Sequence, residues 1–392
     1  MNLQVQPDVA APERRIPFER VALVLQGGGA LGAYQAGVYE ALAEAGIHPD
    51  WIAGVSVGAI NAAIIAGNPP TSRIERLCEF WTQATAGGHW PWFGGDRAAR
   101  GDVVRNLFNQ VSAGFAFANG APGFFTARAL PPWLQPAGTI EATSFYDTGA
   151  LKHTLERLVD FDRLNAGAMR FSAGAVNVRT GNFVYFDTTT HTIRPEHVMA
   201  SGALPPGLPA IEIEGEHYWD GGLVSNTPLQ WVVESEPRHD TLAFQVDLWS
   251  ARGEFPRTML DVMTREKEIR YSSRTRLNTD FFMQLQSLRR AFHRLHEKLP
   301  PELRNDPDAR MLDEHACGAA ITIVHLIHRR AAYERFSMDY EFSRLSMLEH
   351  WQAGLHDVRH TLNQPAWRER KKSDRGVTIL DLTRDEESEM AK

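Results

Sequence analysis

Cysteine is scarce in this sequence, with only Cys78 and Cys317 among 392 residues. Two cysteines exclude a disulfide-stabilised scaffold and fit a reducing compartment. Long apolar runs are also missing, since no stretch reaches the roughly 18 uninterrupted apolar residues of a transmembrane helix. Residues 1–15 lack the basic start and apolar core of a signal peptide. We therefore expect a cytoplasmic protein, with peripheral attachment to a membrane left open.

Positive charge is in deficit over the whole chain, which carries a formal net charge of −7. This balance argues against a general nucleic-acid binder. Residues 265–304 are the exception, with ten Lys or Arg against five Asp or Glu. A basic amphipathic helix there would bind an anionic membrane surface, whereas internal ion pairs would leave it an ordinary solvated face. The sequence leaves both interpretations open, and it leaves a homo-oligomer open as well.

An alternation of strands and helices begins after the polar N-terminal residues. Residues 21–25 and 51–55 are apolar runs of strand length, and residues 31–45 and 57–66 are rich in helix-forming residues. This order predicts an α/β fold with a mainly parallel sheet and helices on its faces. Five more segments have strand character, namely residues 171–177, 182–188, 241–248, 320–326 and 376–382.

Composition divides the chain further. Residues 1–19 are polar and aperiodic, so we expect a flexible arm. Residues 86–146 are dense in glycine, proline and aromatic residues, and form either a lid over an apolar pocket or a looped insertion packed on the core. Residues 251–363 are predicted to form a mostly helical extension with a late strand, and residues 364–392 a charged tail.

Two glycine-rich motifs lie after the first two predicted strands. Residues 27–32 satisfy the G-x-G-x-x-G pattern of a dinucleotide-binding loop, which requires an acid at the end of the second strand. The acid here, Asp50, precedes that strand instead. The strand is followed by Gly54-Val55-Ser56-Val57-Gly58, the G-x-S-x-G pattern of a nucleophile elbow. The alternative for Ser56 is a helix N-cap between two packing glycines.

The glycine loop of residues 27–32 has a second interpretation if Ser56 is a nucleophile. Adjacent parallel strands would bring Gly27, Gly28 and Gly29 next to Ser56, where their backbone N–H groups could form an oxyanion hole. A phosphate cradle would use the same backbone donors. The residue after the second strand is a serine and not an acid, which favours the oxyanion hole over the phosphate cradle.

A serine nucleophile needs a base. Six histidines lie late in the chain, but none has the glycine-rich or turn setting typical of a catalytic loop, so we expect structural roles for His315, His325, His328, His350, His356 and His360. A better candidate is Asp220, which precedes Gly221 and Gly222. Burial could raise its pKa toward the working pH. An ordinary Asp-Gly turn is the alternative.

Three blocks together resemble the patatin-like phospholipases, namely residues 27–32, residues 54–58 and Asp220-Gly221-Gly222. Residues 201–206 and 226–228 are similar to the segments that flank the acid block. The resemblance covers residues 20–250, and residues 255–363 resemble the C-terminal extension of a bacterial subgroup. It implies a hydrolase domain over residues 20–250, folded as a three-layer α/β/α sandwich. Many members have Arg or Lys where this chain has Leu31, which puts the head-group preference in doubt.

The resemblance also implies roles for these residues. Ser56 would be the nucleophile and Asp220 the base of a Ser–Asp dyad without histidine. The Gly27–Gly29 backbone would form the oxyanion hole. The other glycines of the motifs would serve the turns, namely Gly32, Gly54, Gly58, Gly221 and Gly222.

The expected function is hydrolysis of lipid esters by a phospholipase A, lysophospholipase or carboxylesterase. A short-chain ester or storage-polyester hydrolase is the alternative substrate class. A dinucleotide-binding protein and a membrane-interaction module are the alternatives of another class. No cofactor or metal is expected, because three histidine pairs with helix-face spacing lack accompanying carboxylates in a known pattern: His293/His296, His325/His328 and His356/His360.

Overall fold

The computed structural model describes residues 17–88, 101–272, 275–372 and 376–382. A large central sheet contains β1 (Arg20–Leu25), β2 (Trp51–Val55), β6 (Arg170–Asn177), β7 (Phe183–Asp187), β8 (Ile211–Ile213), β9 (Glu216–Asp220), β10 (Thr241–Asp247), β11 (Ile321–Ile327) and β12 (Val377–Asp381). The strand order is β12-β11-β10-β1-β2-β6-β9-β8, and β7 also pairs with β6.

Most of this sheet is parallel. The strands from β12 to β6 pair in parallel, whereas β7 and β9 run antiparallel to β6, and β8 runs antiparallel to β9. The mainly parallel sheet predicted from the sequence is confirmed. The strands expected at residues 320–326 and 376–382 are confirmed as β11 and β12, and both join the same sheet as β1.

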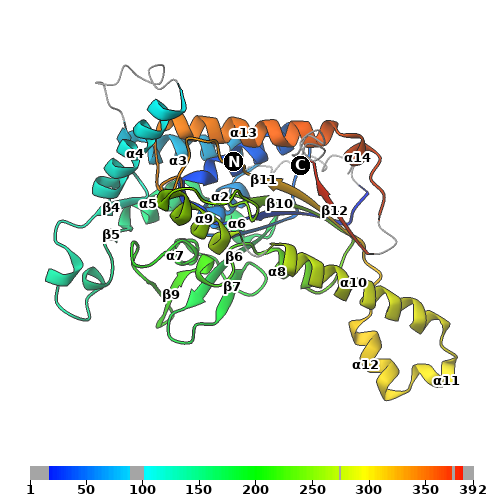
Figure 1. The fold of residues 1–392 in the computed structure, drawn as a ribbon. Helices are drawn as coiled ribbons and strands as arrows, with labels where there is room; N and C mark the ends of the chain where they lie inside the picture. Colours follow the sequence, from blue (N-terminus) through cyan, green and yellow to red (C-terminus); the bar gives the residue numbers. More distant parts are fainter. Residues whose placement is uncertain (1–16, 89–100, 273–274, 373–375, 383–392) are drawn as a thin grey trace, which may run out of the picture.

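Helices cover both faces of the sheet, which gives three layers (Figure 1). One face packs against α1 (Ala33–Glu44), α2 (Val57–Ala66), α3 (Arg73–Ala84) and α13 (Arg344–Asn363), and the other against α8 (Leu229–Glu234) and α10 (Thr275–Lys298). Side chains alternate along each strand. Leu23 of β1 accordingly joins the first of these cores, and Ala22 and Val24 join the second.

Helices α1 and α13 lie against each other with almost no space between their backbones. A Cβ atom on Gly37 would stand 1.9 Å from the carbonyl oxygen of Trp351, and one on Gly354 would stand 2.1 Å from that of Tyr34. Arg359 of α13 also pairs with Glu44 at 2.7 Å. This contact fixes the C-terminal helix on the N-terminal half of the fold.

Seven further helices among the described residues complete the sandwich and the C-terminal region. They are α5 (Gly149–Leu158), α6 (Phe161–Asn165), α7 (Pro195–Ser201), α9 (Met259–Tyr271), α11 (Pro301–Arg304), α12 (Pro307–His315) and α14 (Pro365–Arg368). Figure 1 shows α11 and α12 extending away from the sheet at the end of α10. No helix in the described part of the chain has both the length and the apolar composition needed to cross a membrane.

The basic stretch of residues 265–304 begins in α9 and continues through α10. Several of its charges are paired in the structure, as Lys267 is with Asp339 at 2.5 Å and Arg265 with Glu268 at 3.0 Å. These pairs favour the interpretation of this part of the stretch as a face with internal ion pairs.

The aromatic segment contributes both to the core and to the surface. It contains α4 (Asp102–Asn119) and a small sheet of β3 (Gly120–Ala121), β4 (Phe125–Ala127) and β5 (Tyr146–Asp147). Phe124 and Phe125 are buried against Phe342, whereas Phe117 is 69% exposed and Trp133 is 73% exposed. Trp90, Trp92 and Phe93 fall outside the described residues, as does most of the N-terminal arm.

Candidate active site

Ser56 stands on a sharp turn between β2 and α2. Its backbone has φ 57° and ψ −129°, a conformation that a residue other than glycine rarely adopts. A Cβ on Gly54 would be 2.3 Å from the Gly58 carbonyl oxygen, and one on Gly58 would be 2.4 Å from the Leu25 oxygen. The two glycines are therefore required by the close approach of strand and helix, as the elbow pattern predicts.

Ser201, at the end of α7, holds this turn from the other side. The Ser56 N–H donates to both the carbonyl oxygen and the Oγ of Ser201, each at 3.0 Å. The Ser201 hydroxyl itself donates to the carbonyl oxygen of Gly174 on β6 at 2.6 Å. The strained backbone of Ser56 is thus tied to a second element of the fold.

Asp220 ends β9 and lies opposite Ala175 of β6, so the sheet carries it to the carboxyl end of β2. Its side chain lies beside the Ser56 side chain, and its Oδ1 accepts from the Gly222 N–H at 2.7 Å. The residue is only 2% exposed. This burial raises the pKa of Asp220 to about 7, although the neighbouring Ser56 hydroxyl and Gly222 N–H act in the opposite direction.

The loop of residues 27–29 is held by buried side chains from distant parts of the chain. Its Gly27 carbonyl oxygen accepts from the Asn226 Nδ2 at 3.0 Å and from the Trp249 Nε1 at 2.9 Å. The preceding Gln26 accepts the Leu248 and Trp249 backbone N–H groups at 2.6 and 2.9 Å. The loop is therefore fixed before any ligand arrives.

Two backbone donors of this loop are not used by the described residues. The Gly27 N–H donates to the Asn226 carbonyl oxygen at 3.2 Å, and the Ala30 N–H to that of Asp339 at 2.7 Å. Between them, the Gly28 and Gly29 N–H groups have no partner in the described part of the chain. Gly29 has φ +56°, and a Cβ there would stand 2.1 Å from the Asp339 oxygen, so only glycine fits.

Ser56, Asp220 and residues 27–29 line one cavity of about 290 Å³. Most of its other walls are apolar, and they are formed by Phe124, Phe125, Gly202, Leu204, Pro205, Pro206, Gly207, Leu208, Gly222, Asn226, Trp249, Tyr271, Asp339, Tyr340 and Phe342. The aromatic segment supplies two of these residues, and the chain after residue 270 supplies four. The arrangement offers a hydroxyl, a carboxyl and backbone donors at one end of an apolar pocket.

Residues that the dinucleotide interpretation would need lie elsewhere. Asp50 precedes β2, and its Oδ2 accepts the Val21 N–H at 2.7 Å. Its carboxylate is therefore bound to the beginning of β1. The carboxyl end of β2 is occupied by Ser56. Leu31 is fully buried in the core and does not line the cavity.

Histidine takes no part in the cavity, since none of its described lining residues is a histidine. His325 lies within β11 and is 9% exposed. His328 and His350 are buried near each other, with ring centroids 5.0 Å apart. Sequence reasoning did not identify this pair, because no local pattern connects the end of a strand with the middle of a later helix.

Several supporting residues also carried no recognisable sequence signal. Trp249 holds the glycine loop, and Asp339, Tyr340 and Phe342 form one wall of the cavity. They are brought to the site by the pairing of β10 with β11 and by the packing of α13. Asn226 lies in residues 226–228, which resemble a segment of the patatin-like family. The sequence does not predict its two side-chain hydrogen bonds, to Gly27 and Tyr271.

Comparison with known families finds two matches in the chain. Residues 23–232 match the family described as "Patatin-like phospholipase", and residues 269–374 match one described as "Patatin phospholipase". The first match covers more than half of the chain and contains Ser56, Asp220 and the glycine loop. The resemblance predicted from the three blocks is therefore confirmed.

Individual relatives match over shorter segments. The chain is 40% identical over 81 residues to "Patatin-like phospholipase domain-containing protein 7" of Rattus norvegicus, covering 18% of this chain and 6% of that protein. It is 55% identical over 53 residues to "Lysophospholipase nte1" of Aspergillus terreus, covering 14% and 4%. The matched segments thus span only a small part of these much longer relatives.

Among solved structures, the crystal structure of VipD from Legionella pneumophila is similar over 95% of this chain and 72% of that one. The TM-score is 0.35 and the sequence identity is 15%.

Proposed function

The chain belongs to the patatin-like phospholipase family, a family of carboxylic ester hydrolases, and we propose that it hydrolyses lipid esters with a Ser56–Asp220 dyad. The observation that carries this proposal is the buried Asp220 carboxyl beside the Ser56 hydroxyl in one apolar cavity, next to the Gly28 and Gly29 N–H groups, which have no partner among the described residues. A phospholipase A, a lysophospholipase and a carboxylesterase would all use this chemistry.

In the first half of the reaction, the Asp220 carboxylate accepts the Ser56 proton as the Oγ attacks the ester carbonyl. The carbonyl oxygen becomes an oxyanion. The tetrahedral intermediate then collapses, the bond to the alcohol breaks, and the alcohol leaves with the proton held by Asp220. An acyl ester remains on Ser56.

In the second half, Asp220 accepts a proton from a water molecule, which attacks the acyl ester. A second tetrahedral intermediate collapses with return of the proton to Ser56. The products are a free carboxylic acid and the regenerated hydroxyl. Asp220 thus acts as base and as acid in turn, which suits a group whose pKa is raised to about 7.

The proposed oxyanion hole consists of the Gly28 and Gly29 N–H groups. Gly27 supports it, because its own N–H donates to Asn226 and its carbonyl oxygen accepts from Asn226 and Trp249. Each donor to an oxyanion contributes about 3–4 kcal/mol to the transition state. Fixed donors contribute most, since they need no reorganisation during the reaction.

The cavity argues for an acyl chain as the bound group. Its walls are mostly apolar, and its volume of about 290 Å³ lies at the lower end of the ~300–1,000 Å³ typical of ligand pockets. One acyl chain fits this description better than two. The same size also suits a short-chain ester or a storage polyester, which is the second candidate substrate class.

Treatment of lipid extracts with the protein, followed by mass spectrometry, tests the proposed function. We expect free fatty acids and the matching deacylated lipids to accumulate, and a fluorophosphonate probe to label Ser56. A chain-length series of soluble esters then separates the two substrate classes. Labelling of another residue, or no product from either class, would contradict the proposal.

Peripheral contact with a lipid surface is proposed for the residues that follow the acid block. Leu223 and Val224 come directly after Gly222, which lines the cavity, and they are 45% and 59% exposed. Apolar side chains beside a cavity entrance can insert into a lipid surface. The basic residues of α9 are less suited to this contact with lipid, since Arg265 pairs with Glu268 and Lys267 pairs with Asp339.

The double variant Leu223→Ser/Val224→Ser is expected to raise the apparent KM on phospholipid vesicles roughly thirtyfold, since each exposed side chain contributes about 1 kcal/mol on burial. Its activity on a soluble ester should stay within about twofold of the unmodified protein. Leu303→Ser is the control, because this residue is 52% exposed on α11, away from the sheet (Figure 1). Equal loss on vesicles and soluble esters would exclude a surface role.

A further inference from the structure

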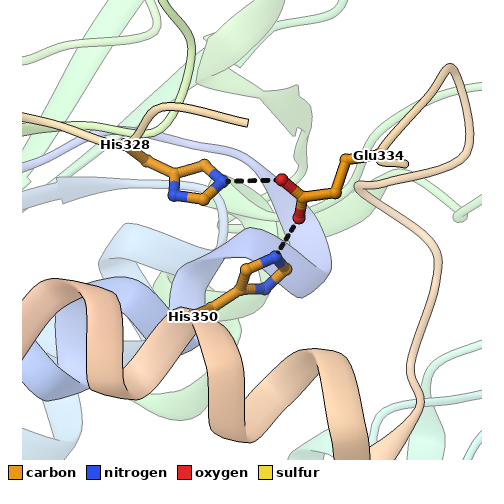
Figure 2. Close-up of side chains that lie close together, drawn as sticks. All are labelled: His328, Glu334 and His350. Carbon is orange, nitrogen blue, oxygen red and sulfur yellow. Dashed lines mark hydrogen bonds and ion pairs between the residues drawn. The ribbon is translucent and has the colours of Figure 1, made fainter. Parts of the chain in front are cut away.

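A buried cluster of His328, Glu334 and His350 lies outside the cavity. His328 directly follows β11, Glu334 lies in the loop after it, and His350 belongs to α13. Figure 2 shows the Glu334 carboxylate between the two imidazole rings, with one oxygen directed at each. The three residues are 5%, 5% and 4% exposed. Three metal-ligating side chains from three separate segments therefore meet in the interior.

The spacing between His328 and Glu334 fits two ligands of a shared cation, whereas His350 and Glu334 are in direct contact. One ligand atom from each residue lies within 4.8 Å of the others. The His328 Nε2 stands 3.6 Å from the Glu334 Oε2, which is too long for a hydrogen bond. Two ligands held about 2.1 Å from a tetrahedral zinc ion are about 3.4 Å apart. The His350 Nε2 contacts the other carboxylate oxygen directly.

Hydrogen bonding alone leaves this cluster incomplete. Neither ring nitrogen of His328 has a hydrogen-bond partner in the described part of the chain, and the His350 Nδ1 also lacks one. An imidazole buried to this extent normally has its polar atoms satisfied. A cation between His328 and Glu334 would engage the unpartnered Nε2.

Space for one further ligand adjoins the cluster. A small cavity of about 10 Å³ is lined by Glu334, His350, Glu341 and Asn109, among others. That volume is close to the minimum that holds one water molecule. The buried Asn109 Oδ1, a lining acceptor, has no partner among the described residues. A water molecule there could complete a four-coordinate site.

We propose that His328, Glu334 and His350 bind a divalent transition-metal ion of the zinc class. Two imidazoles and one carboxylate form a donor set that zinc accepts, and calcium and magnesium prefer oxygen ligands. Binding requires both imidazoles to ligate in the neutral form, so any proton shared within the cluster is released to solvent. The ion itself undergoes no redox change.

The position of the site suggests a structural rather than a catalytic role. None of its three ligands lines the cavity. The loop that contains Glu334 continues to Asp339, whose carbonyl oxygen accepts the Ala30 N–H, and to Tyr340 and Phe342 in the cavity wall. A bound ion would tie this loop to β11 and α13. Only this consequence rests on the proposed hydrolase function, whereas the metal site itself does not.

Metal content of the full-length protein tests the proposal. The protein is stripped with a chelator, dialysed against ZnCl2 and analysed by elemental mass spectrometry. We expect about one zinc per chain, and at least about tenfold less in His328→Gln and His350→Gln. His325→Gln, in the strand that precedes His328, and His356→Gln, exposed on the same helix as His350, should keep the zinc.

A measurement on the unmodified protein keeps the test independent of variant folding. Co2+ added to the stripped protein is expected to give the strong visible absorption of a four-coordinate site, abolished by an equivalent of Zn2+. Zinc should also raise the Tm of the unmodified protein and of the two control variants. A folded protein that takes up no zinc and gives no such absorption would overturn the proposal in favour of a metal-free His–Glu–His cluster. Zinc retained by folded His328→Gln and His350→Gln would overturn it too.

Discussion

Replacement of Ser56 by alanine is expected to lower kcat for ester hydrolysis by about 10⁴-fold or more, with little change in KM. Alanine has no nucleophilic oxygen, so no acyl ester can form. The variant keeps the apolar cavity and the Gly28 and Gly29 donors, which bind the ester without attacking it. Steady-state kinetics on a soluble ester measures the effect, and a fluorophosphonate probe should no longer label the protein.

The fold should tolerate this replacement. The backbone at Ser56 is held by its N–H, which donates to Ser201, and alanine keeps that contact. Ser225→Ala is a suitable control, because Ser225 is close in sequence to the site but does not line the cavity. Its kcat should stay within about twofold. If Ser56→Ala were folded and retained activity similar to this control, Ser56 would not be the nucleophile.

Much of this site could be predicted from the sequence, because the glycine loop and Ser56 follow the adjacent strands β1 and β2, and Asp220 ends a strand of the same sheet. The G-x-S-x-G turn is a local consequence of strand and helix backbones in close approach, so Gly54 and Gly58 identify it directly. The glycine loop follows the neighbouring parallel strand. The two glycines after Asp220 identify it in the sequence. A Cβ atom on either glycine would meet a backbone or side-chain oxygen.

The C-terminal contribution could not be predicted in the same way. The sequence does foresee β11 and α13 as elements, but not that their connecting loop crosses the glycine loop. The contact between Ala30 and Asp339 depends on the pairing of β10 with β11, which joins segments far apart in the chain. A boundary near residue 250 follows from the motifs. The sheet and the cavity nonetheless include residues on both sides of it.

The histidine cluster illustrates a second limit of sequence reasoning. His325 and His328 are spaced for one face of a helix, but His325 lies in β11 and His328 directly follows this strand, so the pair shares no helix face. His328 instead meets His350 and Glu334 through tertiary packing (Figure 2). Spacing along the sequence therefore gives no indication of this cluster.

Replacement of Asp220 by asparagine is expected to lower kcat by about 10²–10⁴-fold, the usual contribution of a general base. Asparagine can still accept the Gly222 N–H, but it cannot take the Ser56 proton. The unmodified enzyme should lose activity as the pH falls below 7 and reach a plateau above it, because the pKa of Asp220 is raised to about 7 and the base must be ionised. A pH–rate profile measures this midpoint, which should be absent in the variant.

The same substitution should stabilise the protein at pH 8. Burial raises the folded-state pKa of Asp220 from its ordinary value near 4 to about 7. The stability that this group contributes is therefore complete below pH 4 and is lost as the pH rises through 7. Asparagine removes the cost of the buried charge, so we expect urea unfolding to require more denaturant at pH 8. The gain should shrink toward pH 5.

Asp247 offers a matched control for this pair of effects. It is also fully buried with a pKa raised to about 7 by its burial, but it does not line the cavity. Asp247→Asn should therefore show the gain in stability at pH 8 without the loss of kcat, and its pH–rate midpoint should stay near 7. Loss of stability in Asp220→Asn, or equal losses of kcat in the two variants, would contradict a role for Asp220 as the base. Stability gained together with activity lost, at Asp220 alone, is what a buried carboxylate maintained for proton transfer requires.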